Sequence, residues 1–411
     1  MAQELKTTPL NGWHRSAGAN MADFGGYDMP LWYETGVKNE HLGVLKSAGI
    51  FDTSHMACIA VTGKDAFDLL QLCFTRDISS LADGRCVYGA FLNEEGHSLD
   101  DAIVYKFGTG DYMICVNSGM GPDISAHLDA HKKDGNADIR DLTDQVAKMD
   151  VQGKNSARIL AKVLKDPDSV FAKMPYFSFK GRADGNSDTL LADGTPILLS
   201  RSGYTGEFGF EIFVSPDAIV KLWKDILEAG KEYDITACGL GSRDSLRAGA
   251  VLPLSHQDIG EWKFINHPWD FALPFNEDRT GFTKEFVGKA ALEKGFDRYV
   301  YPFAGDSLRK VAAGEQTQVL DESGSAIGHV LTCATDMGIG WHDGRIFSIA
   351  SPDLPADAKI KGISCGFVMV DKKLEYGDRL TLKENKRKIE VTVVRDVRPD
   401  RTARKAIKNF I

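Results

Sequence analysis

The chain has 411 residues, of which 43% are hydrophobic and 26% charged, as in a typical folded globular protein. A net charge of −9 argues against a surface adapted to nucleic acid, and no stretch approaches the ~20 apolar residues of a membrane helix. Because the start lacks an apolar signal core and the seven scattered cysteines form no C-x-x-C pair, we expect a cytoplasmic protein with reduced thiols and about two or three domains.

Hydrophobic periodicity divides the first 300 residues into helices and strands. The spacing predicts helices over about residues 36–49, 64–73, 121–133, 155–165 and 216–230. Strands are predicted over about residues 57–62, 87–93, 99–107, 112–117, 147–152, 197–201 and 208–214. The mixture predicts an α+β fold in which helices pack on largely antiparallel sheets.

From about residue 300 the sequence changes to short β-like runs, at 318–320, 328–332 and 389–394. The segment 253–285 before it is rich in Pro, Trp, Asn and His and is typical of a functional loop or linker. We therefore predict a catalytic region over residues 1–280, made of two α+β lobes, and a β-barrel-like domain over residues 281–411.

The end of the chain is basic. Residues 386–408 contain nine Lys or Arg and three acidic residues. This pattern is typical of a solvated strand with a frayed end, and it also fits a binding site for a polyanion.

Asp100 and Asp101 are adjacent carboxylates in the apolar run 99–105. In a strand the period of two sends them to opposite faces, so they are not expected to act as one acid/base dyad. One of them should face the interior or a cleft, where an Asp is either a proton acceptor and ligand anchor or simply a hydrogen-bonded Asp near a turn.

Two glycine-rich segments also bear functional side chains. The turn 202–211 places Tyr204, Glu207 and Glu211 between two apolar runs, and it has neither the G-K-[ST] ending nor the βα context of a nucleotide site. A hairpin with a bulge explains it equally well. Residues 239–247 resemble a loop entering a helix. Arg243 there could bind a ligand carboxylate with two hydrogen bonds, or it could form an ordinary ion pair at the start of the helix.

His127 and His131 have the i, i+4 spacing of a helical metal site. No nearby glutamate or cysteine in the sequence completes a ligand set, so no metal is expected.

Together these segments resemble the aminomethyltransferase, or T-protein, family of the glycine cleavage system. The resemblance covers about residues 20–300 and weakens beyond. It rests on sequence motifs at residues 24–31, 40–42, 49–56, 92–101, 116–117, 151–153, 203–207, 239–247 and 286–292.

The resemblance implies a three-lobed, cloverleaf-like fold around an opening that holds tetrahydrofolate, with a β-rich C-terminal domain. It implies transfer of an aminomethyl carbon from a lipoylated H-protein to tetrahydrofolate, with release of ammonia. By motif, Asp100 falls on the acidic residue near the reacting folate nitrogen. Further positions fall on the lining of the folate site, with Arg243 facing either the folate glutamate or Glu211: Met56, Tyr88, Val116, Tyr204, Glu211 and Arg243.

The chain departs from the family pattern where the carbon donor should bind, at residues 248–258, 264–269 and 332–338, and carries an insertion over 338–358. The donor therefore remains open between the H-protein and a small N-, O- or S-methyl compound, which would make the chain a demethylase. A non-catalytic folate-binding assembly factor is a further alternative, although the cysteine-containing signature of that group, Lys-Gly-Cys-Tyr-x-Gly-Gln-Glu, is absent.

Overall fold

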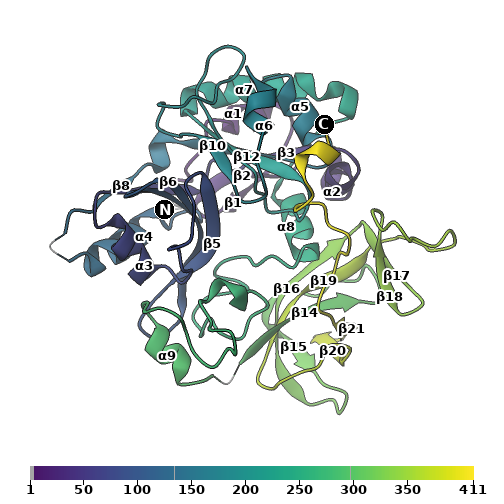
Figure 1. The fold of residues 1–411 in the computed structure, drawn as a ribbon. Coiled ribbons are helices and arrows are strands. Elements are labelled where there is room, and N and C mark those ends of the chain that lie inside the picture. The colour runs from purple at the N-terminus through teal and green to yellow at the C-terminus, as the bar shows by residue number, and fades with distance from the viewer. Residues whose placement is uncertain (1–3, 134, 297) are drawn as a thin grey trace.

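The computed structural model describes residues 4–133, 135–296 and 298–411 and folds them into three lobes. Figure 1 shows a six-strand lobe at the top, a five-strand lobe at the left and a barrel at the lower right. The predicted α+β, three-lobed fold with a β-rich C-terminal domain is confirmed. Within the described ranges, none of the helices has the length and apolar character needed to cross a membrane.

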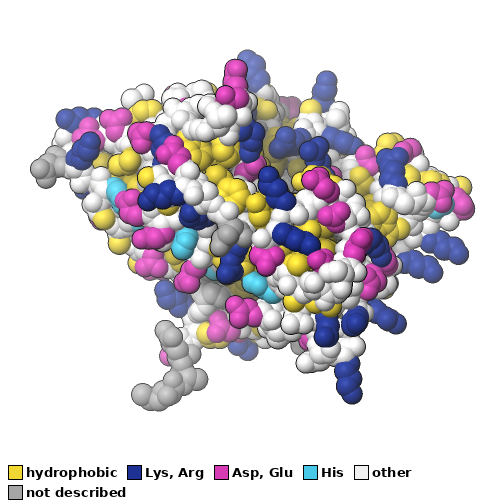
Figure 2. Space-filling view, turned by 90° about the horizontal axis from the view of Figure 1, so that it is seen from below, with side chains coloured by type: hydrophobic (Ala, Val, Ile, Leu, Met, Phe, Trp, Pro, Cys, Tyr) yellow, Lys and Arg dark blue, Asp and Glu magenta, His cyan; other side chains and the backbone are white. Residues whose placement is uncertain are grey.

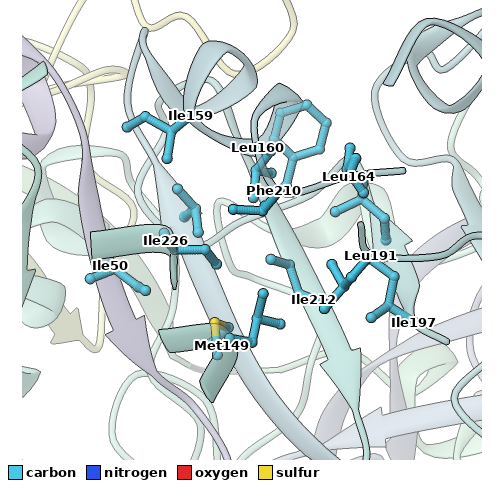
Figure 3. Close-up of a cluster of buried hydrophobic side chains, with 14 of the residues drawn as sticks. Ile50, Met149, Ile159, Leu160, Leu164, Leu191, Ile197, Phe210, Ile212 and Ile226 are labelled. Carbon is cyan, nitrogen blue, oxygen red and sulfur yellow. The ribbon is translucent and has the colours of Figure 1, made fainter. Parts of the chain in front are cut away.

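The six-strand lobe is built on a mixed sheet with helices packed on both faces. In spatial order its strands are β10 (Phe179–Gly181), β11 (Leu198–Ser200), β12 (Gly209–Val214), β9 (Ala147–Gln152), β3 (Gly49–Asp52) and β13 (Thr236–Cys238). The helices of this lobe are α1 (Asn11–Ser16), α2 (Gly36–Lys46), α5 (Ser156–Ala161), α6 (Pro167–Phe171) and α7 (Pro216–Ala229), with the 3-10 turn η2 (Lys231–Tyr233) and the hairpin of β1 (Asn20–Phe24) and β2 (Tyr27–Trp32) beside them. Apolar side chains of one face of the sheet and of α5 and α7 point toward one another in its core (Figure 3), while α2 packs on Phe51 of the other face. Helix α5 is shorter than the predicted 155–165 because the chain turns at Lys162.

The five-strand lobe is inserted into the six-strand lobe, because the chain leaves after β3 and returns at β9. Its strands in spatial order are β5 (Arg85–Leu92), β6 (Ser98–Gly108), β7 (Asp111–Val116), β4 (Ala57–Thr62) and β8 (Asp138–Asp141), followed by the 3-10 turn η1 (Thr143–Gln145). Helices α3 (Ala66–Cys73) and α4 (Gly121–His131) cover one face. The other face packs on Phe179, Leu198 and Phe213 of the six-strand lobe, so the two sheets share a buried interface.

The barrel is closed by six antiparallel strands. Their order is β14 (Tyr299–Gly305), β19 (Ile363–Val370), β16 (Ala326–Asp336), β15 (Gly314–Leu320), β20 (Arg379–Glu384) and β21 (Arg387–Val393). The inserted residues 338–358 begin with the hairpin of β17 (Ile339–His342) and β18 (Arg345–Ser348). The domain boundary between residues 280 and 281 stays a prediction.

A central segment joins the three lobes. Helix α8 (Leu240–Gly249) lies in the middle of Figure 1, and residues 250–288 after it contain only the 3-10 turn η3 (Asp270–Ala272) before α9 (Lys289–Glu293). Apolar side chains of this segment pack against both β5 and β19. The loop is therefore buried packing between two lobes rather than a free linker.

The C-terminal tail returns to the six-strand lobe (Figure 1). Ile407, in the 3-10 turn η4 (Ile407–Asn409), joins the core of that lobe, and the Phe410 ring stacks on Phe208 with centroids 4.1 Å apart. The prediction of a frayed end is wrong, because these apolar side chains anchor it.

The basic charge of the tail is partly neutralised within the molecule. Arg398 is buried and pairs with Asp336 and Glu207, and Arg401 lies 2.5 Å from Asp396. Figure 2 shows acidic and basic side chains intermingled over the face seen from below, as expected for a chain of modest net charge. The alternative of a polyanion-binding site stays a prediction.

Candidate active site

Two groups of polar side chains lie at the junction of the lobes. The carboxylate pair consists of Asp100 and Asp101 on β6, with Asn117 after β7. The Lys148 cluster consists of Lys148 and Asp150 on β9, Glu211 on β12 and Arg243 on α8. Tyr204 stands between them: its ring lies 5.0 Å from the Arg243 guanidinium and its hydroxyl donates to the Pro253 carbonyl of the central segment.

Asn117 holds the two carboxylates together. Its side-chain Nδ2 donates to Asp100 Oδ1 at 2.7 Å and to Asp101 Oδ1 at 2.6 Å, and its backbone N–H donates to Asp100 Oδ2 at 2.8 Å. The Tyr88 hydroxyl donates to Asp101 Oδ2 at 2.9 Å. Asp100 is fully buried, whereas Asp101 and Tyr88 are half-buried.

The carboxylates titrate near neutral pH. Burial raises the pKa of Asp100 to about 6, and burial together with the charge of Asp100 raises the pKa of Asp101 to about 7. The ionisation of each carboxyl therefore influences the other near physiological pH. One amide nitrogen bridges the two carboxylates near the start of β6, and that they do not act as one acid/base dyad stays a prediction.

The central segment covers Asp100. Ser255 donates to Asp100 Oδ1 at 2.7 Å, and His256 Nε2 lies 3.6 Å from the same oxygen. Arg247 fixes the segment through an ion pair with Asp258, which is buried. Residues 248–258, where the sequence differs from the family motif, therefore line one side of the candidate site.

The Lys148 cluster is a buried network of alternating charge. Lys148 Nζ lies 3.0 Å from Asp150 Oδ1 and 2.5 Å from Glu211 Oε1, and Arg243 Nη1 lies 2.7 Å from Asp150 Oδ2. Ser202 donates to the other oxygen of Glu211. Burial opposes ionisation, but the charges of Lys148 and Arg243 lower the pKa of Asp150 to about 2.

These contacts decide one alternative left open by the sequence. Arg243 forms its ion pair with Asp150 rather than with Glu211, whose ionic partner is Lys148. Lys148 and Asp150 were not among the predicted site residues. Their signal was present, because two opposite charges at i and i+2 in the strand 147–152 point to one face of a buried sheet.

Of the seven predicted site residues, six border these two groups. Met56 is half-buried with its sulfur 3.8 Å from Lys148 Nζ, and Tyr88 and Tyr204 are half-buried beside the carboxylate pair and Arg243. Val116 is the exception. Its side chain is fully buried in the apolar cluster beneath α3 and α4, and only its chain neighbour Asn117 reaches the site.

The sequence predicts no metal site, because no glutamate or cysteine lies near His127 and His131 along the chain. The structure brings a cysteine to them. Cys73 lies beside His127 and His131, and the three potential ligand atoms are within 4.8 Å of one another. The sequence could not show this because Cys73 is distant along the chain and is placed by the packing of α3 on α4.

Comparisons with known proteins agree with the fold and the residue pattern. The GCVT N-terminal domain family matches residues 10–267. Aminomethyltransferase of Bacillus cereus (strain G9842) is 34% identical over 349 residues, covering 81% of this chain and 92% of the relative, and that of Bacillus cytotoxicus is 34% identical over 335 residues, covering 78% and 88%.

A solved structure extends the similarity to nearly the whole chain. The glycine cleavage system aminomethyltransferase T from Bartonella henselae superposes with a TM-score of 0.76 at 27% identity, covering 95% of this chain and 97% of that one. The shared domain, the extent of the sequence identity and the shared three-lobed fold lead to one conclusion: this chain belongs to the aminomethyltransferase family of GCVT-domain proteins.

Proposed function

We propose that this chain transfers an aminomethyl carbon from the lipoyl arm of an H-protein to tetrahydrofolate, releasing ammonia and forming methylene-tetrahydrofolate. Family membership supports the reaction class. The observation that carries the proposal is the carboxylate pair, held by Asn117 beside half-buried Tyr88 at the junction of the lobes.

The Lys148 cluster supplies the recognition of the folate ring in this proposal. A pterin presents an amide-amidine edge, and a buried carboxylate can hold it with paired hydrogen bonds. Glu211 accepts from Lys148 and Ser202, which leaves about two of its four lone-pair sites for a ligand. Tyr204 and Tyr88 offer flat faces for ring packing, and Met56 offers an apolar contact.

Arg243 and Val116 play lesser parts. Arg243 is committed to Asp150 on one side and remains slightly exposed, so a second carboxylate, that of the folate glutamate, can approach its remaining donors. Because the Val116 side chain faces the apolar core, a folate contact at this position would come from its backbone.

Asp100 acts as the catalytic carboxylate in this proposal, coupled to Asp101. Two folate nitrogens bond in turn to the methylene carbon and each loses a proton, while the bonds of that carbon to the amine and to the lipoyl sulfur break and ammonia and the lipoyl thiol each gain one. A carboxyl pair with pKa values of about 6 and 7 is suited to both kinds of proton transfer near neutral pH. Holding donor and acceptor together, away from water, supplies the rest of the acceleration.

One observation favours a second candidate, a tetrahydrofolate-dependent demethylase acting on a small methylated compound. In the segment that differs from the family motif, Ser255 donates to Asp100 and His256 lies 3.6 Å from it. A different sequence in this segment would change which carbon donor fits beside Asp100 and would leave the folate-binding residues unchanged.

Turnover with tetrahydrofolate and two classes of donor distinguishes the candidates. Methylene-tetrahydrofolate and ammonia from aminomethyl-loaded H-protein would support the proposal. Methyl-tetrahydrofolate from a panel of methylated amines, ethers and thioethers would support the demethylase. Folate binding without turnover of either donor would contradict both and leave a folate-binding assembly factor.

A further inference from the structure

A cluster of soft metal ligands lies on the outer face of the five-strand lobe, away from the candidate active site. Cys73 is the last residue of α3, and its side chain is buried in the core beneath that helix. His127 and His131 are one helical turn apart on α4, with ring centroids separated by 4.6 Å. The glutamate side chain of Glu94, in the turn between β5 and β6, places Oε1 3.8 Å from His131 Nε2.

The hydrogen bonds of the two histidines leave the correct nitrogens free. His131 Nδ1 lies 2.8 Å from the His127 carbonyl oxygen, a contact in which the ring must donate, so the lone pair of neutral His131 resides on Nε2. Metal-bound histidines usually donate a hydrogen bond of this kind from the ring nitrogen that does not bind the metal. His127 Nε2 is buried without a hydrogen-bond partner among the described residues, which is a costly state unless something binds it.

The separations fit a tetrahedral ion. Bonds of ~2.0 Å to nitrogen and ~2.3 Å to sulfur place neighbouring ligand atoms ~3.5 Å apart. The three ligand atoms already lie within 4.8 Å of one another, so they need to close by little more than about 1 Å. Half-buried His127 and His131 can make that adjustment by side-chain rotation.

We propose that Cys73, His127 and His131 bind a divalent ion of the Zn²⁺ class, with Glu94 or water as the fourth ligand. One thiolate and two imidazoles select borderline-soft ions over Mg²⁺ or Ca²⁺. Binding displaces the thiol proton of Cys73 into solvent, so the affinity falls as the pH is lowered.

The ion has a structural role in this proposal. It ties the end of α3 to the end of α4, and through Glu94 it reaches the turn of the β5–β6 hairpin. That hairpin carries Asp100, whose strand partner Phe91 has its ring 6.3 Å from the His127 ring. The site therefore braces the outer side of the hairpin whose inner side bears the carboxylate pair.

Metal titration of the full chain tests the proposal. The protein should carry no polyhistidine tag and should first be stripped with a chelator. Co²⁺ should then bind with one ion per chain and produce a thiolate-to-metal charge-transfer band together with the visible bands of a tetrahedral complex, and Zn²⁺ should displace it.

Variants locate the ion. Cys73→Ser should abolish the charge-transfer band, and His131→Ala should weaken binding at least about tenfold. Cys333→Ser in the barrel and His342→Ala in the β17–β18 hairpin are matched controls that should bind as the wild type does. Because Cys73 is buried, the half-buried His131 gives a variant that keeps its fold, and Zn²⁺ should raise the Tm of the wild type but not of His131→Ala. Absence of Co²⁺ binding, or binding unchanged in Cys73→Ser, would overturn the proposal.

Discussion

Asn117 explains why two adjacent aspartates can remain together in a buried site. Its amide donates to both carboxylates, and its backbone adds a third bond to Asp100, so the negative charge of the pair is stabilised locally. The same burial keeps both pKa values near neutrality. Charge stabilisation and proton affinity are thus balanced by a single residue that carries no charge.

Asp100→Asn should lower kcat at least tenfold, a barrier change above about 1.4 kcal/mol, because the amide cannot accept the proton. The matched control is Ser255→Ala, which removes one hydrogen bond to Asp100 and leaves its carboxylate in place. A decrease no larger than that of Ser255→Ala, measured where both variants are fully folded, would argue against a catalytic role.

The activity of the wild type should rise with pH between about 6 and 7, as the two carboxyl groups ionise. In Asp101→Asn the neighbouring negative charge is gone, the pKa of Asp100 falls, and the rise should shift to lower pH. Because both folded pKa values exceed the ordinary value of 3.8, the contribution of the pair to stability falls as the pH rises toward 7. Asp101→Asn should therefore lose less stability than the wild type on going from pH 5 to pH 8, and equal losses in thermal melts would contradict the titration.

Glu211→Gln should weaken tetrahydrofolate binding by about 1.5–3 kcal/mol, roughly tenfold to hundredfold in Kd, because a charge-assisted hydrogen bond to the pterin is lost. Glu228→Gln on the exposed side of α7 is the control and should bind normally. Unchanged affinity in Glu211→Gln, measured by calorimetry, would remove this residue from the proposed folate site.

At the scale of single residues, the sequence identified site residues that lie in distinctive family motifs. It missed site residues whose role depends on contacts with residues far away in the chain. Asp100, Glu211 and Arg243 stand in recognisable segments. Ser255 and Asp150 contribute through contacts with residues more than 90 positions away, at |i−j| of 155 and 93. No local pattern encodes such pairs.

At the scale of the element, strand β9 shows how one buried strand can support a polar site. All six of its residues are buried, and alternation sends Lys148 and Asp150 to the face opposite Met149 and Val151, which lie in the apolar core. The strand thereby joins the core of the six-strand lobe to the candidate active site.

Lys148→Met should lower the free energy of unfolding by about 3–5 kcal/mol, because it leaves Asp150 and Glu211 as buried charges without their shared partner. Lys221→Met is a matched control: that lysine also contacts two aspartates, but it is exposed on α7, and its loss should leave the free energy of unfolding nearly unchanged. Equal losses in urea unfolding would show that burial does not set the strength of the cluster.

Elements with strong periodicity were predicted well. The strand 57–62 matches β4, and the helix 216–230 matches α7 to within a residue. The segment 253–285 was correctly expected to be irregular, but its packing between β5 and the barrel could not be read, because Phe264 and Trp269 are apolar residues with no repeating period.

At the scale of the whole molecule, one buried network joins the barrel, the C-terminal tail and the six-strand lobe. Asp336 at the end of β16 bonds to Arg398 in the tail and lies 3.0 Å from His41 Nε2 on α2, and Arg398 also contacts Glu207. Although burial opposes ionisation, Arg398 and His41 lower the pKa of Asp336, so its contribution to stability is present at neutral pH and lost in acid.

Arg398→Met should uncouple the barrel from the six-strand lobe, because Asp336 and Glu207 then lose their shared cation. We expect a lower Tm and two unfolding transitions in calorimetry. Arg401→Met, which breaks a more exposed pair with Asp396, is the control and should melt close to the wild type. A single unshifted transition in Arg398→Met would show that apolar packing alone joins the lobes.

The return of the tail to the six-strand lobe has a consequence for synthesis in the cell. Translation proceeds from the N-terminus, and domains begin to fold as they emerge. The six-strand lobe cannot bury Phe208 fully until Phe410, far along the chain, has left the ribosome. Closure of this lobe is therefore delayed until the barrel and the segment after it have been made, and a product interrupted before Phe410 would expose an apolar face that quality-control proteases can recognise.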